Sequence, residues 1–209
     1  MAISLVRVVK ADLDGLSIAA NTVAKGGIIC YPTDTVYGLG CDPFNLSAVE
    51  KAMMAKGRGT KAMPVLVHCI EDAERLVFFS EAAKRIAKRF WPGPLSIVLP
   101  ARESVPSILA PERTVAVRSP NHAICHQLLV LCSGMLVGTS ANRAGSQPAT
   151  SADDVVEQLD DCVDVVLDGG KSPMRVASTV IDLTKQQLVV LREGPIGKTE
   201  ILRTLRNSR

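Results

Sequence analysis

The segment Tyr31-Pro-Thr-Asp-Thr-Val-Tyr-Gly-Leu-Gly40 follows a short apolar run, Gly27 to Cys30, that reads as a buried strand. A second polar segment, Thr139-Ser-Ala-Asn-Arg-Ala-Gly-Ser-Gln-Pro-Ala149, follows the apolar run Met135 to Val137 in the same way. In an open α/β sheet, ligands bind in the crevice outside the carboxyl ends of the strands. Glycines let a ligand approach the backbone there, and hydroxyl and amide side chains supply compact hydrogen-bonding groups. The two segments together therefore predict a ligand site.

Patterns typical of helices and strands alternate outside these two segments. Helices are predicted at residues 16–25, 48–55, 71–77, 81–90, 120–131 and 151–159, with starts at Ser47, Ser119-Pro120 and Ser151. Strands are predicted at residues 27–30, 63–68, 95–99, 115–117, 135–137, 163–167, 178–183 and 188–191. Alternation that ends in a cluster of strands favours an α/β fold, with a twisted mixed sheet of parallel and antiparallel strands and helices packed on it. No repeat or linker divides the chain, so we expect a single domain over residues 1–209.

The composition favours a soluble protein with a sizeable core. Of the 209 residues, 47% are hydrophobic, which supplies enough apolar side chains without disulfides or metals. No apolar run approaches the ~20 residues of a membrane-spanning helix, and the N-terminus lacks the layout of a signal peptide. The six cysteines include no C-x-x-C pair, so we expect reduced core thiols. A cytoplasmic protein without membrane contact is therefore predicted.

The charge is mildly positive, at a formal +3, and it is unevenly placed. Lys56, Arg58 and Lys61 cluster in one glycine-containing loop, whereas Arg118 and Arg192 each end a predicted strand. Each cation by itself is as consistent with an ordinary surface charge, but together they would form a pocket for an anion such as a polyphosphate. Aromatic residues make up only 3% of the chain, which disfavours a surface that binds RNA by base stacking.

Several common catalytic devices are missing from the sequence. Gly194-Pro-Ile-Gly-Lys-Thr199 is similar to a phosphate-binding loop, but Arg192 stands where the first glycine is required. No G-x-S-x-G elbow occurs, and the three histidines show no pattern of metal ligands. Acidic residues near the two polar segments are limited to Asp34 and Asp42, which favours catalysis by positioning and charge neutralisation over acid–base chemistry.

The assembled motifs resemble those of the YrdC family. They occur in the family's order over nearly the whole chain, and they are Pro32-Thr-Asp-Thr-Val-Tyr-Gly-Leu-Gly40, Lys56-Gly-Arg58, Pro64-Val-Leu-Val-His68, Trp91-Pro-Gly-Pro-Leu95, Val115-Ala-Val-Arg-Ser-Pro120, Ser140-Ala-Asn142, Ala177-Ser-Thr-Val-Ile-Asp182 and Leu191-Arg-Glu-Gly194. The resemblance implies an α/β fold with a concave, cationic cavity over a twisted sheet. It also implies a nucleotidyltransferase that makes threonylcarbamoyl-AMP and pyrophosphate from L-threonine, bicarbonate and ATP, for the t6A37 modification of tRNA.

The same resemblance implies roles for individual residues. L-Threonine would be held by Thr35, His68, Arg118, Gly138 and Ser178. ATP would contact Lys56, Arg58, Thr114, Ser140, Asn142, Pro148 and Arg192, with Lys56 and Arg58 also acting in catalysis. Mg²⁺ would accompany ATP and be held largely by the phosphates, with no metal site on the protein itself. Met63 stands where many relatives have a polar residue, which leaves one ATP contact of the family open.

Two alternatives to this enzyme remain on the sequence alone. The first is a non-catalytic module of the same fold that binds double-stranded RNA or tRNA, and the second is the adenylate-handling part of a larger carbamoyltransferase. The intact signatures Lys56-Gly-Arg58 and Ser140-Ala-Asn142 favour the enzyme over the first, and the short chain without cysteine pairs disfavours the second. The resemblance further suggests tRNA and downstream threonylcarbamoyl-transferase proteins as partners.

Overall fold

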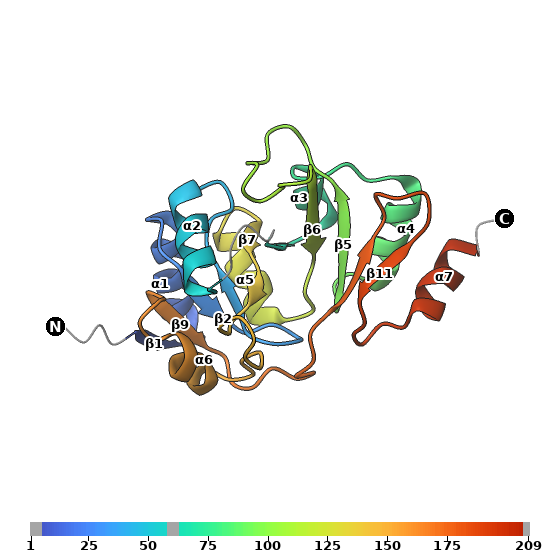
Figure 1. Cartoon of the computed structure of the whole chain (residues 1–209). Coiled ribbons are helices and arrows are strands. Elements are labelled where there is room, and N and C mark those ends of the chain that lie inside the picture. The colour runs from blue at the N-terminus through green and yellow to red at the C-terminus, as the bar shows by residue number, and fades with distance from the viewer. Residues whose placement is uncertain (1–5, 58–62, 207–209) are drawn as a thin grey trace.

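The computed structural model describes residues 6–57 and 63–206, and its strands form two sheets where the sequence predicted one (Figure 1). One sheet has five strands in the order β1-β9-β2-β3-β8, and the other has six in the order β11-β10-β5-β6-β4-β7. The strands are β1 Arg7–Lys10, β2 Ile29–Tyr31, β3 Gly38–Gly40, β4 Val65–Val67, β5 Leu95–Pro100, β6 Thr114–Arg118, β7 Met135–Val137, β8 Thr139–Ser140, β9 Val165–Asp168, β10 Thr179–Asp182 and β11 Val189–Arg192.

Both sheets mix parallel and antiparallel pairs, which confirms the predicted fold class. In the five-stranded sheet, β9 is parallel to β1 and β2, whereas β3 is antiparallel to β2 and β8. In the six-stranded sheet, β10 is parallel to β5 and β4 is parallel to β6, and the other pairs are antiparallel. Because β4 and β6 run in parallel with Leu66 opposite Arg118, the residues that follow these two strands emerge at the same sheet edge.

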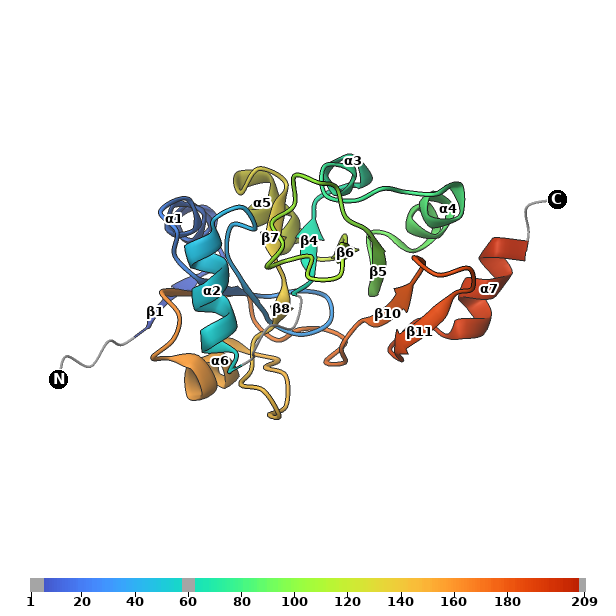
Figure 2. The same cartoon turned by 45° about the horizontal axis from the view of Figure 1, so that its top comes forward.

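The two sheets are joined where β7 leads through Gly138 into β8 (Figure 2). The backbone N–H of Gly138 donates to the carbonyl of Pro64 at 2.8 Å, which fixes the crossing against the start of β4. A Cβ atom at Gly138 would lie 2.3 Å from the side chain of Leu66. A residue with a side chain would therefore push Leu66 aside at the junction of the two sheets.

Helices cover the two sheets, and they are α1 Leu13–Ala24, α2 Leu46–Ala55, α3 Ile70–Glu74, α4 Glu81–Phe90, α5 Ala123–Leu131, α6 Ala152–Leu159 and α7 Lys198–Arg206. Helix α1 packs against α5, β2 and β9, and α7 packs against α4 beside the six-stranded sheet (Figure 1). The predicted bounds of α4 are confirmed at both ends. Strands β1, β3 and β8 and helix α7 were not predicted from the sequence.

The helix starts show which capping signals the fold uses. Helix α6 begins as predicted, with Ser151 as its N-cap in a capping box. The predicted start of α2 at Ser47 is wrong, because Asn45 supplies the capping side chain two residues earlier. The predicted start of α5 at Ser119 is also wrong. His122 caps that helix instead. The Ser119 hydroxyl does not act as a cap, because it donates to a backbone carbonyl that follows β4.

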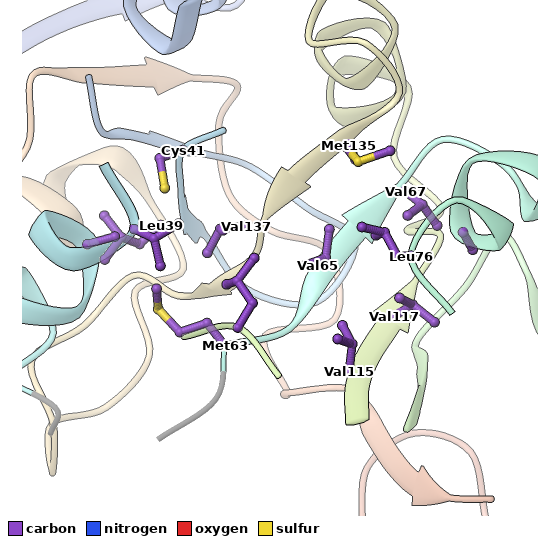
Figure 3. Close-up of a cluster of buried hydrophobic side chains, with 14 of the residues drawn as sticks. Leu39, Cys41, Met63, Val65, Val67, Leu76, Val115, Val117, Met135 and Val137 are labelled. Atoms are coloured by element: carbon purple, nitrogen blue, oxygen red, sulfur yellow. The ribbon is translucent and has the colours of Figure 1, made fainter. Parts of the chain in front are cut away.

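Buried apolar side chains from β3, β4, β6 and β7 form the centre of the main core (Figure 3). Met63 belongs to this cluster and lies with Leu39 and Val137, and it is only 1% exposed. Its side chain therefore contributes to packing in the place where relatives were expected to present a polar group to ATP.

The cysteines are all free thiols, as the sequence predicted. Cys30, Cys41 and Cys125 are buried, and burial raises the pKa of the Cys41 thiol to about 12. These thiols act as small core residues. Within residues 6–57 and 63–206, no helix is long and apolar enough to cross a membrane.

Candidate active site

A polar pocket lies where the two hydroxyl-rich segments meet. Strands β3 and β8 pair with Gly38 opposite Ser140. Tyr37 fastens the segments further, since its N–H donates to the carbonyl of Ala149 at 2.8 Å and its carbonyl accepts from Ala141 at 2.8 Å. The pocket is lined by Thr33, Thr35, Val36, Tyr37, Gly38, Pro64, Leu66, Ser96, Arg118, Gly138, Thr139, Ser140, Ala177, Ser178 and Arg192. The lining therefore comes from both sheets and from both segments.

Arg118, the last residue of β6, is held by three different partners. Its Nε donates to the carbonyl of Gly93 at 3.0 Å, and Nη1 donates to Oγ1 of Thr35 at 2.9 Å. Its Nη2 donates to Oδ1 of Asp34 and forms an ion pair with it. Both charged residues are buried, where an ion pair is screened less than on the surface. The guanidinium has five N–H groups, so donors remain for the carboxylate of a ligand.

Only one of the two carboxylate oxygens of Asp34 is hydrogen-bonded within the described residues. Its side chain is 2% exposed, and Oδ2 has no hydrogen-bond partner among the described residues. A buried carboxylate oxygen of this kind is costly unless a partner is supplied. Asp34 is not among the pocket-lining residues, so its carboxylate balances the charge of Arg118 from behind the lining.

Lys56 follows the last residue of α2, and its ammonium group is buried behind the second segment. Its Nζ donates to Oγ of Ser140 at 2.9 Å, to Oδ1 of Asn142 at 2.6 Å and to the carbonyl of Ser140. The amide of Asn142 in turn donates to the carbonyls of Arg143 and Ser146, both at 2.8 Å. Lys56 is 1% exposed, so its positive charge reaches the pocket through Ser140, which lines it.

Arg192 ends β11 and contacts Ser178, the residue just before β10. Its Nε donates to the carbonyl of Ser178 at 2.9 Å, and Nη2 donates to the hydroxyl of Ser178 at 3.1 Å. That hydroxyl lies 2.9 Å from the hydroxyl of Ser96 in β5. The three residues form a connected polar wall of the pocket, and Arg192 is its exposed member.

The structure brings together about half of the residues that the sequence predicted for the site. Those lining the pocket are Thr35, Arg118, Gly138, Ser140, Ser178 and Arg192. Lys56 and Asn142 lie directly behind Ser140. His68, Thr114 and Pro148 are not among the lining residues. Arg58 lies outside the described residues.

The predicted residues away from the lining lie in three different places. Thr114 begins β6 opposite Pro100, at the other end of the strand from Arg118. At about 3.3 Å per residue, the two ends of β6 are roughly 13 Å apart. Pro148 lies in the loop before α6, and His68 follows β4, where its ring contacts His126.

Sequence reasoning missed Ser96 and Tyr37 and treated Asp34 only as a scarce carboxylate. Ser96 had a usable signal, because a hydroxyl inside an apolar strand needs a buried partner. Tyr37 donates its phenolic O–H to the carbonyl of Gly170 at 2.7 Å and accepts from the N–H of Gly169 at 3.2 Å. Burial raises the pKa of Tyr37 to about 12, so the phenol stays protonated and holds the segment in place.

Comparison with known proteins identifies close similarity. The Sua5/YciO/YrdC family model, described as "Telomere recombination", matches residues 21–194. The "Threonylcarbamoyl-AMP synthase" of Pyrococcus abyssi is 40% identical over 191 residues, which cover 89% of this chain and 56% of that protein. A "Putative threonylcarbamoyl-AMP synthase" of Mycobacterium tuberculosis is 38% identical over 195 residues, which cover 91% of this chain and 89% of that protein.

The fold is also similar to a solved structure. The crystal structure of P. abyssi Sua5 complexed with L-threonine superposes with a TM-score of 0.89 at 37% sequence identity. The superposition covers 95% of this chain and 60% of the solved chain. The chain thus spans little more than half the length of the Pyrococcus protein, whereas it spans most of the Mycobacterium protein.

Proposed function

The chain belongs to the Sua5/YciO/YrdC family, and from this we propose that it is a threonylcarbamoyl-AMP synthase. L-Threonine, bicarbonate and ATP would give threonylcarbamoyl-AMP, pyrophosphate and water, and the product would serve the t6A37 modification of tRNA. The observation that supports the proposal is that one pocket combines groups suited to an amino acid with groups suited to phosphates. Arg118 and Thr35 suit an amino acid, and Ser140, backed by Lys56, suits phosphates.

The amino acid would bind at the Arg118 cluster. The remaining N–H groups of Arg118 would receive the threonine carboxylate, since an arginine fork matches a carboxylate in shape and charge. Thr35 and Ser178 would supply hydroxyl partners, and Gly138 would let the ligand approach the backbone. A pocket that hydrogen-bonds a substrate hydroxyl discriminates strongly against analogues that lack it.

The chemistry would proceed in two bond-forming steps. Carboxylation joins the threonine nitrogen to the bicarbonate carbon and releases water. An oxygen of the new N-carboxylate then attacks the α-phosphorus of ATP, and the bond from that phosphorus to the oxygen bridging the β-phosphate breaks. Pyrophosphate leaves with that oxygen. The protein would contribute mainly by positioning the two substrates and by offsetting negative charge.

Positive side chains would offset the charge that builds on the phosphates. Arg192 lines the pocket and Lys56 lies behind Ser140, and the signature assigns the same role to Arg58. Mg²⁺ would add charge neutralisation when bound with ATP. In the described part of the chain, no group of three or more His, Cys, Asp or Glu side chains could hold a metal ion. The phosphates and water would therefore be its main ligands, as is usual for Mg²⁺ at nucleotide sites.

Partners and location follow from the proposed product. Threonylcarbamoyl-AMP would pass to downstream threonylcarbamoyl-transferase proteins, which would modify tRNA in the cytoplasm. The adenylate step itself uses no nucleic acid, so tRNA or double-stranded RNA is not needed for catalysis by this chain.

Pyrophosphate release from ATP tests the proposal directly. We expect release to require both L-threonine and bicarbonate, with threonylcarbamoyl-AMP detected by mass spectrometry. Release should fall roughly tenfold when serine, which keeps the hydroxyl but lacks the methyl group, replaces threonine. Thr35→Val should raise the KM for threonine by roughly three- to tenfold, the effect of one hydrogen bond, with little change in the KM for ATP. Thr204→Val on α7 is the matched control and should change neither constant.

Two outcomes would contradict the synthase. One is ATP turnover that does not depend on threonine and bicarbonate. The other is the absence of turnover together with binding of double-stranded RNA that weakens steeply with salt, which would support the binding-module alternative.

A further inference from the structure

The three histidines of the chain gather beside the Arg118–Asp34 pair. His68 follows β4, the parallel neighbour of β6. His122 is the N-cap of α5, and His126 lies in the first turn of that helix. Burial lowers the pKa of His122, the charge of Asp34 opposes this shift, and His126 adds to it. The resemblance to the YrdC family implies a role for His68 in holding threonine but none for His126.

The rings of His68 and His126 share a hydrogen bond. Their Nδ1 atoms are 3.1 Å apart, and the two rings meet edge to face with centroids separated by 5.0 Å. The other ring nitrogen of His126, Nε2, lies 2.6 Å from the carbonyl oxygen of Pro120. Both contacts are within hydrogen-bond distance, so each of them requires one proton.

Counting these protons fixes the tautomer of each neutral ring. A carbonyl oxygen only accepts, so Nε2 of His126 must carry its proton. A neutral imidazole has one N–H, and therefore Nδ1 of His126 is an acceptor. The proton between the rings must then belong to Nδ1 of His68. Nε2 of His68 then carries no proton, and its lone pair can accept a hydrogen bond.

The backbones of both residues are anchored, which makes this pairing a fixed feature. The N–H of His68 donates to the carbonyl of Gly134 at 2.9 Å, and its carbonyl accepts from the Ser119 hydroxyl at 3.0 Å. The N–H of His126 donates to the carbonyl of His122 at 2.9 Å, within the first turn of α5. The hydrogen bond at one ring nitrogen decides which tautomer a histidine adopts.

His68 lies two residues after Leu66, which lines the pocket, but is not itself a lining residue. We infer that His126 is a positioning residue that holds His68 in its Nδ1–H tautomer, so that Nε2 of His68 is available to accept a hydrogen bond from an amino acid substrate bound beside it. The identity of that substrate rests on the proposed function, whereas the tautomer rests only on the two hydrogen bonds of His126. A bare Nε2 suits a donor, and the donors of threonine are its amine and its hydroxyl. The threonine carboxylate cannot donate, so it is left to Arg118.

Nuclear magnetic resonance of the whole chain without substrate tests the tautomer. With only three histidines, ¹⁵N-histidine labelling and long-range ¹H–¹⁵N correlation distinguish the protonated nitrogen of each ring. At a pH where the rings are neutral, we expect His68 to be protonated at Nδ1 and His126 at Nε2. The control is His122→Ser, which keeps a good helix cap and should not change the His68 tautomer. A His68 ring protonated at Nε2 would overturn the inference.

Two substitutions at His126 separate positioning from packing. In His126→Asn, the amide oxygen can stand where Nδ1 stood and still accept from His68. In His126→Gln, the amide nitrogen can stand where Nε2 stood and donate to Pro120, but the acceptor for His68 is lost. In the glutamine variant, we expect the His68 proton no longer to be fixed on Nδ1. The KM for threonine should rise by roughly three- to tenfold, with the KM for ATP unaffected. The asparagine variant should retain the tautomer and most of the threonine affinity.

The outcomes distinguish this inference from the proposed function. Equal effects of the two substitutions on the His68 tautomer would overturn the positioning role, whether or not the chain is a synthase. If the tautomers are as expected but ATP turnover does not depend on threonine, the proposed function fails and with it the assigned ligand. Melting temperatures of both variants, compared with wild type, show whether the fold is retained.

Discussion

The ammonium nitrogen of Lys56 lies 2.6 Å from the amide oxygen of Asn142, and this contact joins residues 86 positions apart. It connects the end of α2 to the loop that follows β8. The same amide donates to the carbonyls of Arg143 and Ser146, so a single side chain both receives a buried positive charge and shapes the loop. Lys56 of the first signature and Ser140 and Asn142 of the second are therefore parts of one structural unit.

Removing the Asn142 side chain should affect stability and ATP use together. Asn142→Ala leaves the buried ammonium of Lys56 with one acceptor fewer and two loop carbonyls without their donor. We expect a loss of about 1–3 kcal/mol in the free energy of unfolding and a higher KM for ATP. Asn142→Asp keeps an acceptor for Lys56 but loses the donor to the two loop carbonyls. Its stability and its KM for ATP should therefore lie between those of the wild type and of Asn142→Ala. Thermal denaturation and steady-state kinetics measure both effects.

Gln147→Ala is the matched control for this loop, because Gln147 is exposed. It should leave both the melting temperature and the ATP kinetics near the wild-type values. Equal stability of Asn142→Ala and Gln147→Ala would mean that the Lys56–Asn142 contact does not organise the loop.

The buried ion pair between Asp34 and Arg118 should show strong coupling. Asp34→Asn or Arg118→Gln leaves the other charge buried without its partner, and we expect each to cost about 3 kcal/mol in the free energy of unfolding. The double variant should lose much less than the sum of the two single losses. Urea unfolding of the four proteins measures the coupling.

The exposed ion pair between Arg143 and Asp161 provides a control cycle, since their side chains are 54% and 65% exposed. Solvent screens such a pair, so its coupling should be close to zero. Additive effects in the Asp34–Arg118 cycle would show that the pair is solvated in the folded protein.

Local signals in the sequence predicted both ends of helix α4, whereas the pairing of strands could not be predicted from them. The pattern over residues 81–90 is amphipathic, and the prolines after Trp91 stop the helix, so both ends can be read from neighbouring residues. Strand β3, Gly38–Gly40, has only three residues and two are glycines, which gives no strand signal of its own. It forms because β2 and β8 pair with it from both sides. The division into two sheets depends on such long-range pairings.

The same distinction separates the predicted and missed parts of the candidate site. Arg118 and Arg192 could be placed because they end apolar runs, and strand ends bring polar residues to a sheet edge. The pairing of Arg118 with Asp34 could not be predicted, since it joins residues 84 positions apart through the packing of a loop on β6. The burial of Lys56 was equally hidden, because a lysine after a helix is usually solvated.

The capping box of α6 should make stability depend on pH in the acid range. The backbone N–H and the hydroxyl of Thr150, together with Ser151, donate to the carboxylate of Asp154 and hold its pKa below the usual range. A lowered native pKa means that the unfolded chain binds the proton more readily, so this stabilisation is complete above the unfolded value and is lost as the pH falls through the native value. Asp154→Asn should therefore lower the melting temperature at neutral pH, with a difference that shrinks below about pH 4.

Asp153→Asn removes the same charge one position away and is the control for this effect. Its carboxylate is exposed and is not the one that accepts from Thr150 and Ser151. A difference between wild type and Asp154→Asn that stays constant from neutral to acid pH would exclude the ionised capping box as its source.

Replacing Arg192 by lysine should separate geometry from charge at the pocket wall. Arg192 donates from two nitrogens to Ser178, and a lysine ammonium keeps the charge but cannot reproduce that fork. Because Arg192 is exposed on the edge strand β11, we expect little change in melting temperature. If Arg192 also grips phosphate oxygens, Arg192→Lys should raise the KM for ATP by roughly tenfold and leave the KM for threonine nearly unchanged. Arg203→Lys on α7, also exposed, should change neither KM. An Arg192→Lys enzyme with wild-type ATP kinetics would show that the arginine does not bind the phosphates.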